Sequence, residues 1–209
     1  MIKINKGPEP QEWINKKKTP GFVYTAIPEL RTALLRDQGY ICGYCMRSIP
    51  VLKADPGNAE KSKIEHLQSR SHFPHLQLEY SNMIICCPGF LNSHNHCDKL
   101  KQSSAISFSP FDENVERSIT YGSKDGKIVS SNANWNKDIN EVLALNNVIL
   151  KLSRKQVLEV VRERIERKKW KRAELEAILS DWKSRDAAGK LKPYCGVVIW
   201  YVTKKLRSL

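Results

Sequence analysis

The chain has 209 residues, and 41% of them are hydrophobic. That length and composition allow one substantial domain, or a compact core with an appended subdomain. No window reaches the run of roughly 18 apolar residues that a membrane-spanning helix needs, and the opening MIKINKGPEP lacks the apolar stretch of a signal peptide. We therefore expect a cytoplasmic protein with no membrane partner, whose six cysteines act as thiols or metal ligands rather than disulfides.

The formal net charge of +13 is unevenly distributed. Residues 137–209 hold 18 Lys and Arg against 9 Asp and Glu, which gives +9, and the remaining +4 falls on residues 1–136. An excess of this size indicates a polyanionic partner, with nucleic acid as the first candidate. A solvated basic surface without such a partner is the alternative reading of the same charge.

The first quarter of the chain predicts an arm, a helix and a tight turn. Residues 1–27 contain the breakers KGPEP and KKTPG, so we expect an irregular arm, with IKI as a possible short strand. PELRTALLRDQG has Pro28 at a suitable first helical position and Gly39 as a stop, which predicts a helix. CGYC (residues 42–45) predicts a knuckle, and residues 53–60 an exposed loop.

The next segment alternates between short apolar runs and polar stretches. KIEHL (63–67) and MIICC (83–87) are compatible with strands, and residues 68–82 between them are polar and predict a loop. HCDKLKQ (96–102) predicts the start of a helix. These elements carry most of the chain's histidines and cysteines.

The second half predicts a hairpin followed by helices. Asp125-Gly126 in GSKDGKIVS is a hairpin-turn signal. From Ile139 to Trp170 apolar residues recur at spacings of three and four, and residues 171–186 continue that pattern after a break, so both stretches predict helices. The final apolar stretch CGVVIWYVTKKL (195–206) fits a helix or a strand.

All five histidines fall between residues 66 and 96, and five of the six cysteines fall between 42 and 97. Cys42 and Cys45 form a C-x-x-C pair, which allows two thiolates to reach one ion from a single turn. A closed zinc site needs four ligands in a tetrahedron. The second pair must come from the later Cys and His residues, namely Cys86, Cys87, Cys97, His94 and His96. A redox pair would need a βαβ context that this sequence lacks.

The order of motifs resembles an HNH nuclease of the zinc-knuckle type. CGYC (42–45) is followed by EH (65–66), then NMIICC (82–87), then CDKLK (97–101). The resemblance extends to KINKGPEPQEW, YSNMIICC, HCDKLKQ, DGKI and LALN, and so covers most of the chain. These stretches are similar to the PtuB-like nucleases of Septu-type anti-phage systems, which also occur beside some retrons.

The resemblance implies an α+β protein with a ββα-metal (HNH) core, a structural zinc knuckle and a mainly helical C-terminal part. Residues 1–27 would form an N-terminal arm, 28–110 the nuclease core, and 111–209 a helical region that docks a partner. In the family frame Cys87 rather than Cys86 takes the zinc position, so the expected zinc ligands are Cys42, Cys45, Cys87 and Cys97. The long insertion PGFLNSHNH leaves open whether His94 or His96 replaces Cys97.

The resemblance also implies roles for the residues between the cysteines. His66 would be the general base, since its ordinary pKa of about 6.5 suits proton transfer at neutral pH. Glu65 and Asp98 would hold one catalytic Mg²⁺ or Mn²⁺, because carboxylate oxygens suit hard cations. Asp98 stands where the family has His or Asn. Asn82 would hydrogen-bond the loop that carries His66 and fix its ring.

The implied function is metal-dependent hydrolysis of nucleic acid, with Lys99 and Lys101 as phosphate contacts. DNA is favoured, but RNA such as tRNA is equally accessible to a mechanism that makes no use of the 2′ hydroxyl. The family works with a partner ATPase of the PtuA type, and in retrons with a reverse transcriptase and its RNA and DNA. This chain has no G-x-x-x-x-G-K-[ST] motif of its own. The alternative function is a non-catalytic, zinc-stabilised module that binds nucleic acid or a protein.

Overall fold

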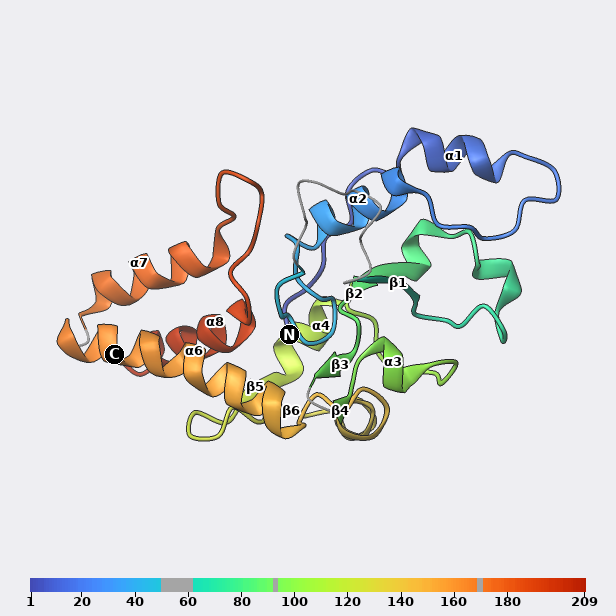
Figure 1. The fold of residues 1–209 in the computed structure, drawn as a ribbon. Coiled ribbons are helices and arrows are strands. Elements are labelled where there is room, and N and C mark those ends of the chain that lie inside the picture. The colour runs from blue at the N-terminus through green and yellow to red at the C-terminus, as the bar shows by residue number, and fades with distance from the viewer. Residues whose placement is uncertain (50–61, 92–93, 169–170) are drawn as a thin grey trace.

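The computed structural model describes residues 1–49, 62–91, 94–168 and 171–209, so the loop expected at 53–60 lies outside the described residues. The architecture is mixed α+β, with small antiparallel sheets and a helical C-terminal part (Figure 1). The strands are β1 (Lys63–His66), β2 (Met83–Cys86), β3 (Phe90–Leu91), β4 (His94–Asn95), β5 (Ile119–Tyr121) and β6 (Ile128–Ser130). The α-helices are α1 (Gln11–Lys17), α2 (Pro28–Asp37), α3 (Asp98–Lys101), α4 (Glu113–Ser118), α5 (Ala133–Lys137), α6 (Val148–Arg167), α7 (Arg172–Lys183) and α8 (Cys195–Leu206).

The N-terminal arm is more ordered than the sequence predicts. Instead of an irregular segment it contains α1, which places the fully buried Trp13 against Phe22 and Tyr24. The Trp13 indole donates a hydrogen bond to the carbonyl of Leu78, 3.0 Å away. Burial of this large ring stabilises a two-turn helix whose local sequence, between two proline-containing breakers, does not favour one. Residues 2–4, for which the sequence also allowed a short strand, do not form one.

Helix α2 matches its prediction and fixes the edge of the first sheet. Pro28 is its first residue, and Leu30, Ala33 and Leu34 are buried. Gln38, directly after the helix, accepts a hydrogen bond from the N–H of Ile85 and donates one to its carbonyl, at 2.7 and 2.8 Å. A buried side-chain amide therefore pairs with the edge of β2 as a neighbouring strand would, which leaves no unsatisfied backbone group there.

The first sheet pairs β1 with β2 in antiparallel register, with Glu65 opposite Ile84 and His66 opposite Met83. The polar stretch between them contains two short 3₁₀ turns, Pro74–Leu76 and Tyr80–Asn82. β5 and β6 form the hairpin that Asp125-Gly126 predicts. Both strand predictions and the hairpin prediction are confirmed.

The C-terminal helices pack against the knuckle. Within the range expected to be one helix, a π-turn at Asp138–Val142 is followed by a break, and Asn147 caps α6 by accepting a hydrogen bond from the N–H of Leu150. The terminal apolar stretch is a helix, α8. Just before it, the N–H groups of Leu191 and Tyr194 donate to the carbonyls of Gly39 and Met46. These bonds tie the C-terminal part to the segment that carries Cys42 and Cys45.

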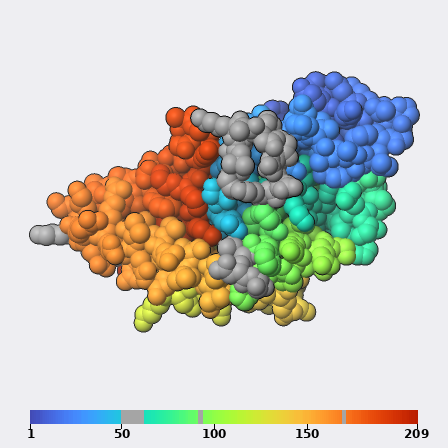
Figure 2. Space-filling model, in the orientation of Figure 1, coloured from blue at the N-terminus to red at the C-terminus, as the bar shows by residue number. Residues whose placement is uncertain are grey.

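Figure 2 shows the C-terminal helices at one end of the molecule, the N-terminal arm with residues 62–80 at the other, and the segments that carry the later cysteines between them. A single cluster of buried side chains connects these parts, from Met1 to Val202. No helix among the described residues is long and apolar enough to cross a membrane.

Candidate metal centre and adjoining active site

Four cysteine sulfurs meet at one point in the interior. Their Sγ atoms all lie within 4.8 Å of one another, and all four residues are buried: Cys42, Cys45, Cys87 and Cys97. The Cys42–Cys97 and Cys45–Cys87 sulfur distances are 3.9 and 3.7 Å. Zn–S bonds of about 2.3 Å in a tetrahedron separate sulfurs by about 3.8 Å. The four cysteines could therefore hold a structural metal such as zinc without rearrangement.

Local backbone geometry brings these sulfurs together. The knuckle closes through hydrogen bonds from the N–H of Cys42 to the carbonyl of Arg47 and from the N–H of Met46 to the carbonyl of Cys42. Cys97 adopts a positive φ of 52° and donates its N–H to the carbonyl of Leu143. Positive φ is costly for a residue with a Cβ, so the surrounding contacts must hold it. The insertion after Cys87 forms the β3–β4 hairpin, which accommodates the long spacing between Cys87 and Cys97.

The two histidines of the insertion lie outside the four-sulfur set. His94 is exposed, whereas His96 is fully buried with its Nε2 3.6 Å from the sulfur of Cys87. The other ring nitrogen of His96 lies 3.3 Å from the carbonyl of His94. Cys97 is therefore the fourth sulfur of the cluster. His96 is a hydrogen-bonding neighbour of the cluster through the sulfur of Cys87.

Burial raises the pKa of the Cys97 thiol well above its usual range. Four thiolates cannot be buried together without compensating positive charge. A bound cation supplies that charge and displaces the protons, so metal binding and folding are coupled at this cluster. The chemistry of the donor set fits zinc.

A second group of polar side chains adjoins the knuckle at Tyr44. Glu65 on β1 is 5% exposed, and its Oε1 lies 2.7 Å from the ammonium of Lys101 and 3.3 Å from the hydroxyl of Tyr44. Asp98, the first residue of α3, is partly exposed. Burial, and then the hydrogen-bonding proximity of Asp98, raises the pKa of Glu65 to about 8. Two neighbouring carboxyl groups in a buried site repel each other when both are ionised. They are stable together when they share a cation or a proton.

The location of Lys101 corrects one expectation. We expected this residue to contact phosphate, but it is 0% exposed and ion-paired with Glu65, and it also donates a hydrogen bond to the carbonyl of His66. Asp98 and Lys101 are three residues apart in α3, so both side chains lie on the face that meets β1. Lys99, expected in the same role, lies on an exposed face.

His66 is held with one ring nitrogen available. Its Nε2 lies 2.9 Å from the carbonyl of Gln77. A carbonyl only accepts hydrogen bonds, so Nε2 carries the proton and Nδ1 has the free lone pair. The ring of Tyr24 packs edge-to-face against the imidazole, at 4.5 Å between centroids. Burial lowers the pKa of His66, which favours the neutral, proton-accepting form.

Asn82 organises the loop that carries Gln77, the hydrogen-bond partner of His66. Its Oδ1 accepts a hydrogen bond from the N–H of Gln68, and its Nδ2 donates to the carbonyls of Gln68 and Leu76, at distances between 2.8 and 3.1 Å. Leu76 directly precedes Gln77, whose carbonyl holds the imidazole. The side-chain amide thus fixes the loop that orients His66.

The sequence did not point to Tyr24, Tyr44 or Gln77. Tyr44 lies between the two knuckle cysteines, and this position could have suggested that its side chain lies close to the metal centre or to the groups beside it. Gln77 acts through its backbone carbonyl, so its side-chain identity contains no signal. Tyr24 reaches His66 only through the tertiary packing of the arm.

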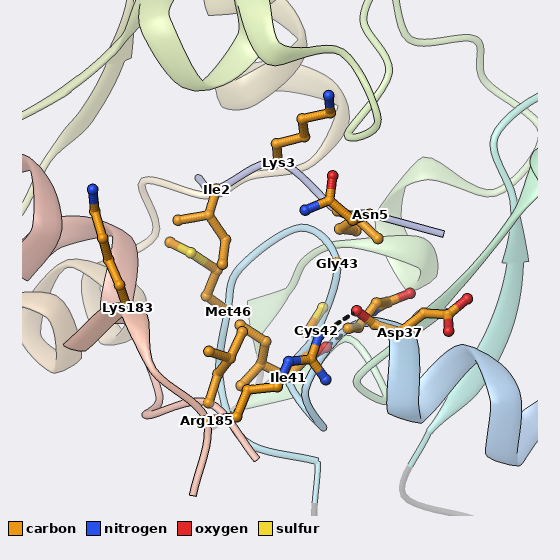
Figure 3. A pocket seen from close by; sticks show the side chains of 13 residues that line it. Ile2, Lys3, Asn5, Asp37, Ile41, Cys42, Gly43, Met46, Lys183 and Arg185 are labelled. Carbon is orange, nitrogen blue, oxygen red and sulfur yellow. Dashed lines mark hydrogen bonds between the residues drawn. The ribbon is translucent and has the colours of Figure 1, made fainter. Parts of the chain in front are cut away.

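The rear of the knuckle lines a small cavity of about 170 Å³ (Figure 3). Its lining includes Cys42, Lys3, Lys183 and Arg185. The guanidinium of Arg185 donates hydrogen bonds to the backbone carbonyls of Arg36, Asp37 and Gly189. The guanidinium of Arg185 is therefore already satisfied by carbonyls, and the cavity is a seam between the N-terminal segment and the C-terminal part of the chain.

No protein-family model matches this chain, and no curated protein matches it. The two centres are therefore interpreted from the chemistry of their residues. One is a closed cluster of four sulfurs, and the other combines a pair of carboxyl groups with a proton-accepting imidazole.

Proposed function

We propose that this protein is a metal-dependent HNH endonuclease that hydrolyses phosphodiester bonds. The observation that carries the proposal is the arrangement of polar side chains at the end of β1. There, Nδ1 of His66 has no hydrogen-bond partner among the described residues, and the adjacent Glu65 lies close enough to Asp98 for that carboxyl to raise its pKa. Hydrolysis of a phosphodiester needs a base for water and positive charge near the phosphate, and these groups meet both needs.

His66 would act as the general base. The Gln77 carbonyl accepts a hydrogen bond from Nε2–H and orients the ring, so a water molecule at Nδ1 would lose its proton to a positioned base. A base positioned in this way contributes on the order of 10²–10⁴-fold to a rate. Asn82 is a positioning residue, because it fixes the loop on which the carbonyl lies.

Glu65 and Asp98 would hold Mg²⁺ or Mn²⁺. Two carboxylate groups are oxygen donors of the kind that hard cations prefer, and a partly exposed Asp98 leaves room for solvent and substrate. When bound, such an ion supplies Lewis-acid stabilisation of the phosphate and of the leaving oxygen. Lys101 balances the charge of Glu65 from the buried side.

The biological setting follows from the motif resemblance described above. We propose that the nuclease acts in anti-phage defence with a partner ATPase of the PtuA type, and in a retron context with a reverse transcriptase. Helix α6 exposes Val148, Leu152 and Val160, which supports protein docking by the C-terminal region. DNA is the favoured substrate, with RNA such as tRNA as the second candidate.

One observation favours the alternative, a non-catalytic zinc-stabilised binding module. Lys101 already neutralises Glu65 at 2.7 Å, and His66 is only 6% exposed. In a binding module these groups would be a buried polar network that holds α3 against β1. The two functions differ in whether His66 is needed for turnover.

The test compares two histidines of the same segment. Zinc-loaded protein, alone and with an ATPase encoded by a neighbouring gene, is incubated with supercoiled plasmid or tRNA in Mg²⁺ or Mn²⁺. We expect metal-dependent cleavage that His66→Ala reduces at least about 100-fold, whereas His72→Ala, in an exposed turn, cleaves normally. Equal cleavage by His66→Ala and wild type would contradict the proposal, and binding without cleavage in all conditions would favour the binding module.

A further inference from the structure

One aromatic side chain is exposed beside the carboxylate centre. Phe90 on β3 is 49% exposed, and no other aromatic side chain in the described ranges is classed as exposed. The ammonium of Lys99 lies 4.5 Å from the centre of its ring. Lys99 directly follows Asp98, so ring and cation lie next to a residue of the proposed catalytic centre.

The strand that carries the ring is held close to the helix that carries Asp98. The N–H of His96 donates to the carbonyl of Gly89, 2.8 Å away, which closes the β3–β4 hairpin. Gly89 has a φ of 71°, and a Cβ on it would lie 2.6 Å from the Cβ of Lys99. Only glycine allows the hairpin to approach the first turn of α3 this closely. The approach explains how Phe90 reaches Lys99.

The described side chains that adjoin Phe90 are polar, although Leu100, which follows Lys99, is 37% exposed. Its cross-strand partner is Asn95, which is exposed, and His94 and Lys99 are exposed as well. A protein-docking patch is usually a contiguous apolar surface. A single aromatic ring among cationic and amide groups matches instead the surfaces that bind nucleic-acid strands, where bases stack on rings and cations contact phosphates.

A second cation–aromatic pair adjoins the other side of the centre. The guanidinium of Arg70 lies 4.7 Å from the ring centre of Tyr24, which packs against His66. Cations are therefore available beyond both His66 and Asp98. A strand whose scissile phosphate lies between these two residues would have phosphate contacts on both flanks.

We propose that Phe90 and Lys99 form a subsite for an unpaired nucleotide next to the scissile phosphate. Bases in a duplex are stacked on each other and cannot cover a protein ring, whereas a single strand or a loop presents free base faces. The inference rests on the proposed nuclease function and adds a substrate class to it, namely single-stranded or looped nucleic acid. It makes no choice between DNA and RNA.

Binding is measured in the His66→Ala background, so that the strand is not cut. A fluorescein-labelled strand of about 12 nucleotides, as DNA and as RNA, is compared with its duplex by fluorescence anisotropy. We expect the strand to bind more tightly than the duplex, and Phe90→Ala to weaken strand binding by about 5- to 150-fold, the range of one stacked base. Duplex binding changes less than about twofold on the same scale.

Three further variants complete the design. Phe90→Trp keeps a stacking face and retains strand binding. Leu152→Ala, which truncates an exposed apolar residue of α6, leaves strand binding unchanged. Lys99→Ala weakens strand and duplex alike and reduces the salt slope by about 1. Each variant must retain its zinc, which shows that the fold is intact.

Failure of this inference is distinguishable from failure of the proposed function. If strand binding is unaffected by Phe90→Ala, or if strand and duplex weaken equally, the subsite is wrong and Phe90 is better explained as a protein contact. If the His66→Ala protein binds neither strand nor duplex in DNA or RNA form, the nuclease function itself is overturned.

Discussion

The four-sulfur cluster and the carboxylate centre are built from adjoining segments but have opposite surroundings. The knuckle, the residue directly after β2 and the residue directly before α3 supply all four buried sulfurs. β1 and α3 supply Glu65, His66 and Asp98, one of which is partly exposed. Cys97 and Asp98 are adjacent, and each belongs to a different centre.

The difference shows how a closed sulfur cluster and a more open polar centre can lie side by side in one small region. A closed sulfur tetrahedron has no free position for substrate, so its contribution is to hold segments together. An oxygen and nitrogen centre with a partly exposed carboxylate keeps positions open. Tyr44 belongs to both regions, because it lies between two ligand cysteines and donates its hydroxyl to Glu65.

The largest expected effect comes from removing one sulfur of the four-cysteine cluster, compared with removing a neighbouring sulfur outside it. Cys87→Ser removes one ligand, and we expect loss of the bound zinc and destabilisation by more than about 4 kcal/mol, the range of metal loss. The matched control is Cys86→Ser, also buried but outside the four-sulfur set. It should keep one zinc per chain and cost about 1–3 kcal/mol for the buried hydroxyl. Metal analysis and denaturant unfolding measure both, and equal zinc loss in the two variants would contradict the assignment.

The second effect lies in the carboxylate centre. Above about pH 8, where Glu65 is ionised, Lys101→Met leaves this carboxylate without its buried counter-ion, and we expect a loss of about 3 kcal/mol in the free energy of unfolding. Adding Glu65→Gln in that background should restore most of the loss, since no unpaired charge is left. Lys99→Met, in the same helix but exposed, should change stability by less than about 0.5 kcal/mol. If Lys101→Met were as mild as Lys99→Met, the buried ion pair would be wrong.

The smallest effect tests the link between the two centres. Tyr44→Phe removes one hydrogen bond to Glu65 and preserves the ring, so we expect a loss of about 0.5–1.5 kcal/mol with zinc content unchanged. Chemical unfolding and metal analysis measure the two quantities. Loss of zinc in this variant would mean that the centres are not separable.

The elements near the site could be predicted because their signals are local. The C-x-x-C pair, the two apolar runs and the Asp-Gly turn each specify structure within a few residues, and β1, β2 and the β5–β6 hairpin form as predicted. The choice of Cys87 over Cys86 follows from the motif frame, and the two residues do separate in the structure.

Features that depend on tertiary contacts could not be predicted. Helix α1 is stabilised by the burial of Trp13 against residues far along the chain, which its own sequence does not reveal. The position of Lys101 depends on which face of α3 meets β1. The carbonyl of Gln77 reaches His66 only through a loop folded by Asn82.

The most direct test of two centres with separate tasks is a titration of zinc-loaded protein with Mn²⁺. We predict one Mn²⁺ site per chain that is lost in Asp98→Asn, while the zinc content stays at one per chain and the unfolding midpoint changes little. Mn²⁺ binding that persists unchanged in Asp98→Asn, or that disappears together with the zinc, would contradict the account.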